Sequence, residues 1–115
     1  MATSTLEIDV QEMTRVDLIT VKGRVDSSNA TELEEVLRER TDSGRYNLVL
    51  NLKDVNYMSS AGLRALVSAL RECKRHRGDV RISQPSERIV EVLDLAGLDP
   101  LFQTYADDTA AVGSF

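Results

Sequence analysis

The hydrophobic period changes from strand-like to helix-like within residues 46–73, which read YNLVLNLKDVNYMSSAGLRALVSALREC. The first part, residues 46–52, is an almost continuous apolar run, and such runs are typical of a strand covered on both faces. After the serines, apolar residues recur at intervals of three and four, at Leu63, Leu66, Val67, Leu70 and Cys73. That spacing is typical of an amphipathic helix. The stretch therefore predicts a buried strand, a loop over residues 53–58 and a helix from Ala61.

Strands and helices alternate along the rest of the chain. Two short strands joined near Thr14 predict an antiparallel hairpin at the start. The further elements expected are a helix from Ala30 to about Gly44, a strand at 80–83, a helix over 85–96, a strand at 101–105 and a terminal helix. Alternation of this kind implies parallel neighbours joined by right-handed crossovers. We therefore expect a single α/β domain over residues 1–115, with a mixed sheet of about five strands and about four helices.

Composition excludes several classes of protein. The chain has 115 residues, of which 42% are hydrophobic and 29% charged, as in a soluble globular domain. Its net charge of −5 makes nucleic acid an unfavourable partner. The apolar runs are too short to span a bilayer, and no secretory signal is evident at the start, so we expect a cytoplasmic protein without a membrane partner.

Few residue types suited to catalysis or metal binding are present. Cys73 is the only cysteine, so no disulfide can form within the chain, and its place on the apolar stripe predicts a small core residue. His76 is the only histidine and lies in the basic cluster of residues 74–77. These cations in the last helical turn, followed by Gly78, are typical of a helix end. We expect neither enzymatic activity nor a bound cofactor or metal.

Two adjacent hydroxyls, Ser59 and Ser60, precede the central helix. One serine there is explained as a helix N-cap, and Ala61 with Gly62 would let the helix approach the sheet closely. The stretch lacks the spacing of a phosphate-binding loop and of a nucleophile elbow. The remaining possibility is a covalent switch, because a phosphate adds about −1.5 to −2 charges and a helix N-terminus tolerates that charge.

Asp26 follows the second predicted strand as the serines follow the third. Ligands and partners of open α/β sheets commonly meet the loops beyond the carboxyl ends of the strands. We therefore expect Asp26 and the two serines to share one surface. Asp26 either caps the first helix or contributes hydrogen bonds to that surface, and the sequence leaves both readings open.

The segment from Asp54 to Arg64, DVNYMSSAGLR, strongly resembles the central motif of STAS-domain anti-sigma factor antagonists. Residues 23–26, 48–52 and 93–98 resemble flanking parts of that family, so the resemblance covers essentially the whole chain. It implies a STAS-like fold and a mechanism called partner switching. The unphosphorylated antagonist binds an anti-sigma factor that is also a serine kinase, and so frees the sigma factor. Phosphorylation by that kinase ends the complex, and a metal-dependent serine phosphatase restores the binding form.

In the family's register the phosphate acceptor is the serine two residues before the motif glycine, which here is Ser60. Ser59 stands where many members have Asp and is the alternative acceptor, whereas Ala61 replaces a Ser or Thr. The resemblance implies a partner-binding surface made of Asp26, Met58, Ser59, Ser60, Ala61, Gly62, Leu63 and Arg64. The alternative function is a STAS scaffold or regulatory module that is not phosphorylated, within a larger signalling or lipid-transport assembly. A small enzyme or nucleotide-binding module is the least supported reading.

Overall fold

The computed structural model describes residues 6–115, and the opening residues 1–5, part of the segment in which no secretory signal is expected, lie outside it. The strands are β1 (Glu7–Glu12), β2 (Asp17–Val25), β3 (Asn47–Met58), β4 (Asp79–Ser83) and β5 (Thr104–Tyr105). The α-helices are α1 (Ala30–Asp42), α2 (Ser60–Arg75), α3 (Glu87–Leu95) and α4 (Asp108–Gly113), and a 3-10 turn spans Asp99–Leu101. The described residues therefore contain the five strands and four α-helices expected from the sequence.

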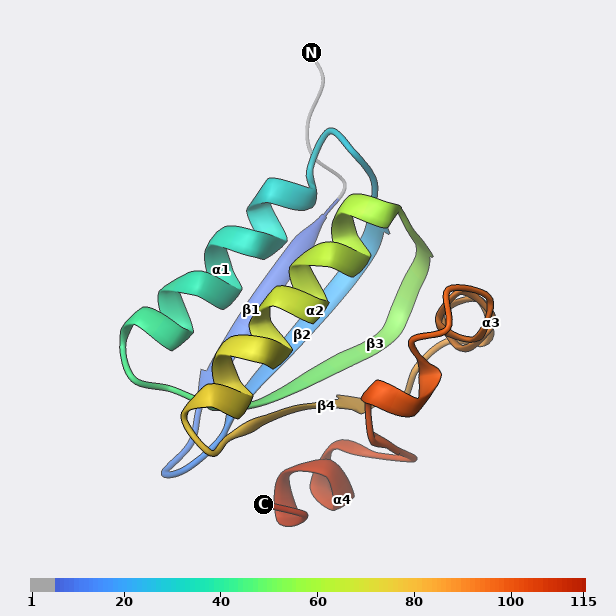
Figure 1. Ribbon diagram of the computed structural model, residues 1–115. Coiled ribbons are helices and arrows are strands. Elements are labelled where there is room, and N and C mark those ends of the chain that lie inside the picture. Colours follow the sequence, from blue (N-terminus) through green and yellow to red (C-terminus); the bar gives the residue numbers. More distant parts are fainter. Residues whose placement is uncertain (1–5) are drawn as a thin grey trace.

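The strands form one sheet in the order β1-β2-β3-β4-β5. β1 pairs with β2 antiparallel, and the remaining neighbours pair parallel. Figure 1 shows α1 and α2 side by side across one face of the sheet, with α3 beyond β3. The predicted mixed sheet, with its antiparallel hairpin at the start, is confirmed.

β3 is buried on both faces, which explains its continuous apolar run. Leu48 and Leu50 belong to the main core between the sheet and the helices. Val49, whose side chain alternates with theirs, packs in a smaller cluster with Leu18 and with Ala111 of α4. The short helix α4 therefore covers part of the sheet face opposite α1 and α2.

β3 is longer than the sequence predicts. The segment expected as a loop, residues 53–58, continues the strand to Met58, and its neighbour β2 runs through Gly23 to Val25. Register shifts interrupt the pairing of these extensions between Thr20 and Lys22 and between Gly23 and Arg24. The expectation of a loop was wrong because the extension is held by pairing with β2, which is distant in sequence. The pairing places Val25 opposite Met58, so both strands end at the same level.

The basic cluster ends α2, as expected, but the glycine after it has a different role. Arg77 takes the left-handed conformation, with φ 65°, and Gly78 does not. The Arg77 amide donates to the Lys74 carbonyl at 3.1 Å. A Cβ on Gly78 would lie 1.9 Å from the Tyr46 carbonyl oxygen. Gly78 is therefore required because the turn between α2 and β4 passes close to the backbone at Tyr46, just before β3.

Substituting Gly78 tests this close approach. Gly78→Ala should lower the free energy of unfolding by about 3 kcal/mol or more, because the added methyl group meets backbone that cannot rotate away. The matched control is Gly113→Ala, where a Cβ meets nothing within 4 Å, and it should change stability by less than about 0.5 kcal/mol. Urea unfolding followed by circular dichroism measures both. Equal stability of the two variants would contradict the packing described here.

Candidate functional site

The ends of β2 and β3 meet the start of α2 at one point. The Ser59 amide donates a hydrogen bond to the Val25 carbonyl at 2.8 Å, directly after the paired residues Val25 and Met58. The chain then turns into α2 at Ser60. This bond brings Asp26, which follows Val25, near the two serines, at the edge of the sheet where β2 and β3 end.

Ser59 is the N-cap of α2. Its backbone is extended, with φ −74° and ψ 169°, and its Oγ accepts a hydrogen bond from the Gly62 amide at 3.3 Å. The Ser59 side chain is half-buried. One of the four amides at the helix start is thereby satisfied. The expectation that one of the two serines caps this helix is confirmed, and the capping residue is Ser59.

Ser60 is the first residue of α2 and points to the outside. It is exposed, and its hydroxyl has no hydrogen-bond partner within residues 6–115. Arg64, one helical turn further on, is also exposed. The two serines therefore differ in surroundings: one hydroxyl is engaged by the backbone and the other is free.

Small residues allow α2 to lie close to the sheet at this end. A Cβ on Gly62 would lie 2.8 Å from Met58 Cγ and 2.8 Å from Val25 Cγ1. Met58 itself is buried, with 3% of its surface exposed, whereas Ala61 and Leu63 are partly buried and pack against the core. The expectation that Met58 and Gly62 form part of a partner-binding surface is wrong, because both are buried between α2 and the sheet. Ala61 and Leu63 remain partly exposed.

Asp26 does not cap the first helix. The N-cap position of α1 is Asn29, which makes no side-chain capping bond. Asp26 Oδ1 instead accepts hydrogen bonds from the Ser28 amide at 2.9 Å and from the Ser28 hydroxyl at 2.5 Å. These bonds from Ser28 lower the pKa of the Asp26 carboxyl, which is therefore ionised at neutral pH. The cap reading is wrong because the chain makes a further turn between Asp26 and α1.

Two residues near this point were missed by the sequence analysis. The Arg24 guanidinium lies over the Tyr57 ring, 4.0 Å from its centroid, and Arg24 Nε lies 3.6 Å from Asp26 Oδ2. Arg24 and Tyr57 are cross-strand partners on β2 and β3. Their contact arises from strand register, for which the local sequence carries no signal. Together with Asp26 they form a charged edge next to the start of α2.

The single cysteine and the single histidine lie away from the start of α2. Burial raises the pKa of the Cys73 thiol to about 12, so the thiol stays protonated and is a poor nucleophile at neutral pH. His76 lies at the opposite end of α2, stacked on Tyr46 with ring centroids 4.0 Å apart. No group of three or more potential metal ligands occurs within residues 6–115. No helix in that range is long and apolar enough to cross a membrane.

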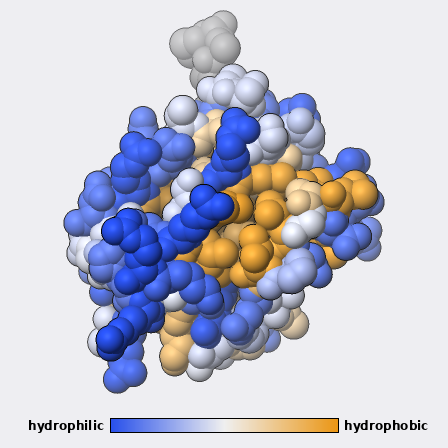
Figure 2. All heavy atoms as spheres, in the orientation of Figure 1, coloured by the Kyte–Doolittle hydropathy of each residue, from blue (hydrophilic) through white to orange (hydrophobic). Residues whose placement is uncertain are grey.

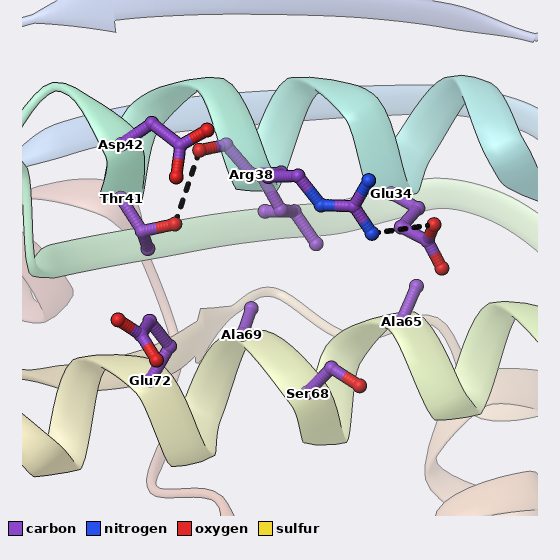
Figure 3. A pocket seen from close by; sticks show the side chains of 9 residues that line it. Glu34, Arg38, Thr41, Asp42, Ala65, Ser68, Ala69 and Glu72 are labelled. Carbon is purple, nitrogen blue, oxygen red and sulfur yellow. Dashed lines mark hydrogen bonds and ion pairs between the residues drawn. The ribbon is translucent and has the colours of Figure 1, made fainter.

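A separate groove lies between α1 and α2. It has a volume of about 300 Å³, and Figure 3 shows its lining. Arg38 pairs with Glu34 at 2.9 Å, and the Thr41 hydroxyl donates to the Arg38 carbonyl at 3.1 Å. Ala65 and Ala69 of α2 line the other wall. These polar groups satisfy one another, and the groove includes neither Ser60 nor Asp26.

Alanine substitutions separate the two serines. Ser59→Ala should lower the free energy of unfolding by about 1 kcal/mol, because it removes the bond that caps α2. Ser60→Ala should change it by less than about 0.5 kcal/mol, because the exposed hydroxyl is not bonded to the protein. Urea unfolding of the two variants makes the comparison. A larger loss for Ser60→Ala than for Ser59→Ala would refute the assignment of the cap.

Comparisons with known proteins show the family of this chain. A family model described as STAS domain matches residues 7–111. The anti-sigma-B factor antagonist of Staphylococcus epidermidis is 33% identical over 98 residues, which cover 84% of this chain and 91% of that protein. The anti-sigma-B factor antagonist of Bacillus subtilis strain 168 is 28% identical over 107 residues, covering 93% of this chain and 97% of that protein.

The fold also matches solved structures of one anti-sigma factor antagonist, SpoIIAA. Its unphosphorylated form superposes with a TM-score of 0.79 at 18% identity, covering 95% of this chain and 98% of that chain. Its phosphorylated form superposes with a TM-score of 0.75 at 18% identity, covering 95% and 100%. With the STAS model spanning most of the chain, and with the strand-to-helix junction built as described, this chain belongs to the STAS domain family, among its anti-sigma factor antagonists.

Proposed function

We propose that this chain acts in the cytoplasm by partner switching. Its unphosphorylated form binds an anti-sigma factor that is also a serine kinase, and this binding frees a sigma factor. Phosphorylation of Ser60 ends the binding, and a metal-dependent serine phosphatase restores it. The observation that carries the proposal is the exposed Ser60 hydroxyl, which has no partner within residues 6–115 and stands beside Asp26 at the start of α2.

The surroundings of the two serines favour Ser60 as the acceptor. A kinase must approach the hydroxyl from outside, and Ser60 is exposed whereas Ser59 is half-buried. The Ser59 oxygen also accepts the Gly62 amide, so a phosphate there would disturb the start of α2. Phosphorylation at Ser60 leaves that cap in place.

The transfer itself needs a base from outside the chain. Ser60 Oγ would attack the γ-phosphorus of ATP held by the kinase, and the bond from that phosphorus to the β–γ bridging oxygen would break. ADP leaves with the bonding electron pair, and the hydroxyl proton passes to a base. No residue within 6–115 accepts a hydrogen bond from Ser60, so we assign the base to the kinase.

A phosphate on Ser60 changes the surface and not the fold. It adds about −1.5 to −2 charges at a helix N-terminus, where negative charge is favourable. SpoIIAA has this fold in its phosphorylated form, which supports a switch that leaves the fold intact. In a complex, the phosphate must lose water beside the ionised Asp26. A penalty of about 3 kcal/mol weakens binding by about two orders of magnitude.

Apolar surface next to the site supports a protein partner. Figure 2 shows a hydrophobic area beside the hydrophilic band of α2, on the side toward α3. Leu63 and Val67 of α2 are partly exposed, and three hydrophobic side chains of α3 and the 3-10 turn are exposed: Val90, Leu95 and Leu101. Leu95 is 80% exposed. Exposed apolar patches of this kind commonly mark protein interfaces.

Mass spectrometry tests the acceptor directly. After incubation with the anti-sigma factor kinase and ATP, the wild-type chain and Ser59→Ala should each gain one phosphate, located on Ser60. Ser60→Ala should gain none. Phosphate found only outside Ser59 and Ser60 would refute the proposed switch. Phosphate on Ser59 alone would change the assigned acceptor from Ser60 to Ser59.

Charge at position 60 tests the consequence of phosphorylation. Ser60→Asp should fold normally and bind the kinase at least about tenfold more weakly than wild type, because it places a negative charge in the interface. The control is Ser60→Asn, because asparagine has nearly the same shape as aspartate but no charge. It should bind within about threefold of wild type. Isothermal titration calorimetry measures both affinities. Equal affinity for Ser60→Asp and wild type would argue for the scaffold that is not phosphorylated.

A further inference from the structure

Positive charge is concentrated on α2 and the turn after it. Residues 60–77 contain five of the 14 Lys and Arg residues and one of the 19 Asp and Glu residues, in a chain with a net charge of −5. The single acid in this range, Glu72, is partly buried and pairs with Arg75 at 2.9 Å. One helix of an acidic protein is therefore cationic.

The cations of α2 lie along its outer side. Every exposed residue of the helix is a serine or a cation: Ser60, Arg64, Ser68, Arg71, Lys74 and Arg75. Arg64, Arg71 and Arg75 are separated by seven and four residues, which places them on one side of the helix. We call these three residues the α2 ridge. Figure 2 shows a hydrophilic band along this helix.

Two guanidinium groups of the ridge are available for a partner. Arg64 and Arg71 have no ion-pair partner within residues 6–115, whereas Arg75 pairs with Glu72. By contrast, Arg45 and Arg40 hold the buried Asp17, at 2.9 and 3.4 Å. An exposed, unpaired guanidinium favours a carboxylate, which it can bind through two hydrogen bonds.

We propose that the α2 ridge extends the docking surface beyond Ser60 and fits an acidic surface on the anti-sigma factor. The inference rests on the proposed function and adds Arg71 and Arg75 to its site. At 1.5 Å per residue, Arg64 begins about 6 Å along the helix from Ser60, and Arg71 lies about 16 Å along it. The ridge thus runs from the acceptor serine along the whole exposed side of α2, next to the apolar surface at Leu63 and Val67.

An acidic partner surface would also explain how a single phosphate on Ser60 can lower the affinity for the partner strongly. The phosphate on Ser60 would face the same acidic surface that the ridge attracts, and like charges repel. It would also lie four residues before Arg64, a spacing at which opposite charges pair along a helix. That pairing withdraws Arg64 from the partner. One modification therefore adds repulsion and removes an attraction.

Association kinetics test the ridge, because charge complementarity acts mainly on the association rate. The rate constant for binding the anti-sigma factor kinase is measured at 50 and 300 mM NaCl for wild type, Arg71→Glu, and the double variant Arg64→Glu/Arg71→Glu. The control is Lys53→Glu, which makes the same charge change as Arg71→Glu at an exposed cation of β3. Lys53 alternates with the core residue Leu52, so it faces away from α2.

At 50 mM NaCl, Arg71→Glu should slow association about tenfold and the double variant about a hundredfold, whereas Lys53→Glu should stay within about twofold of wild type. At 300 mM NaCl the differences should shrink to about threefold or less, because salt screens exposed charges. Circular dichroism confirms that each variant is folded.

Three outcomes would overturn the inference. If the double variant associates as fast as Lys53→Glu, the ridge does not meet the kinase, while the proposed function stands. If the wild type fails to bind the kinase, both are wrong. The last outcome concerns other ligands. If the wild type binds phosphatidylglycerol vesicles or duplex DNA and the double variant does not, while both bind the kinase equally, the ridge serves a different partner.

Discussion

The hydrogen bond from the Ser59 amide to the Val25 carbonyl, 2.8 Å long, is the constraint on which the site depends. It ties the end of β2 to the end of β3 at the residue where the chain turns into α2. The Ser59 hydroxyl then caps the helix through the Gly62 amide, and Gly62 packs against Met58 and Val25, where a Cβ would not fit. Two segments distant in sequence thus present one surface, with Asp26 on one side and Ser60 on the other.

The two serines have different structural roles at this junction. Ser59 keeps its oxygen engaged with the backbone, so α2 begins at a fixed place. Ser60, one residue later, belongs to the helix but keeps its hydroxyl exposed. In the proposed switch, a phosphate on Ser60 would therefore change the surface that a partner contacts without changing how the chain folds. The asymmetry extends along α2, where the buried side carries Leu66 and Leu70 and the exposed side carries cations.

Much of this could be predicted from the sequence, because the decisive patterns are local. The apolar run of β3, the helical spacing of α2 and the cap residue between them all lie within residues 46–73. What could not be predicted depends on strand register. The extension of β3 to Met58 and the contact of Arg24 with Tyr57 both come from pairing with β2. The role of Asp26 could not be predicted either, because aspartate is common both at helix N-caps and in turns. Only the structure shows that the chain makes a turn after Asp26 and that α1 begins after Asn29.

The most direct measurement of the central claim uses phosphoserine itself, incorporated at position 60 during synthesis. Titration calorimetry would compare the affinity of this form for the anti-sigma factor with that of the unmodified chain. The account predicts binding weaker by about a hundredfold or more, since a charge of about −2 must be desolvated against an acidic surface. It also predicts an unchanged far-UV spectrum, because the Ser59 cap is untouched. Equal affinity of the two forms, with both folded, would contradict the account.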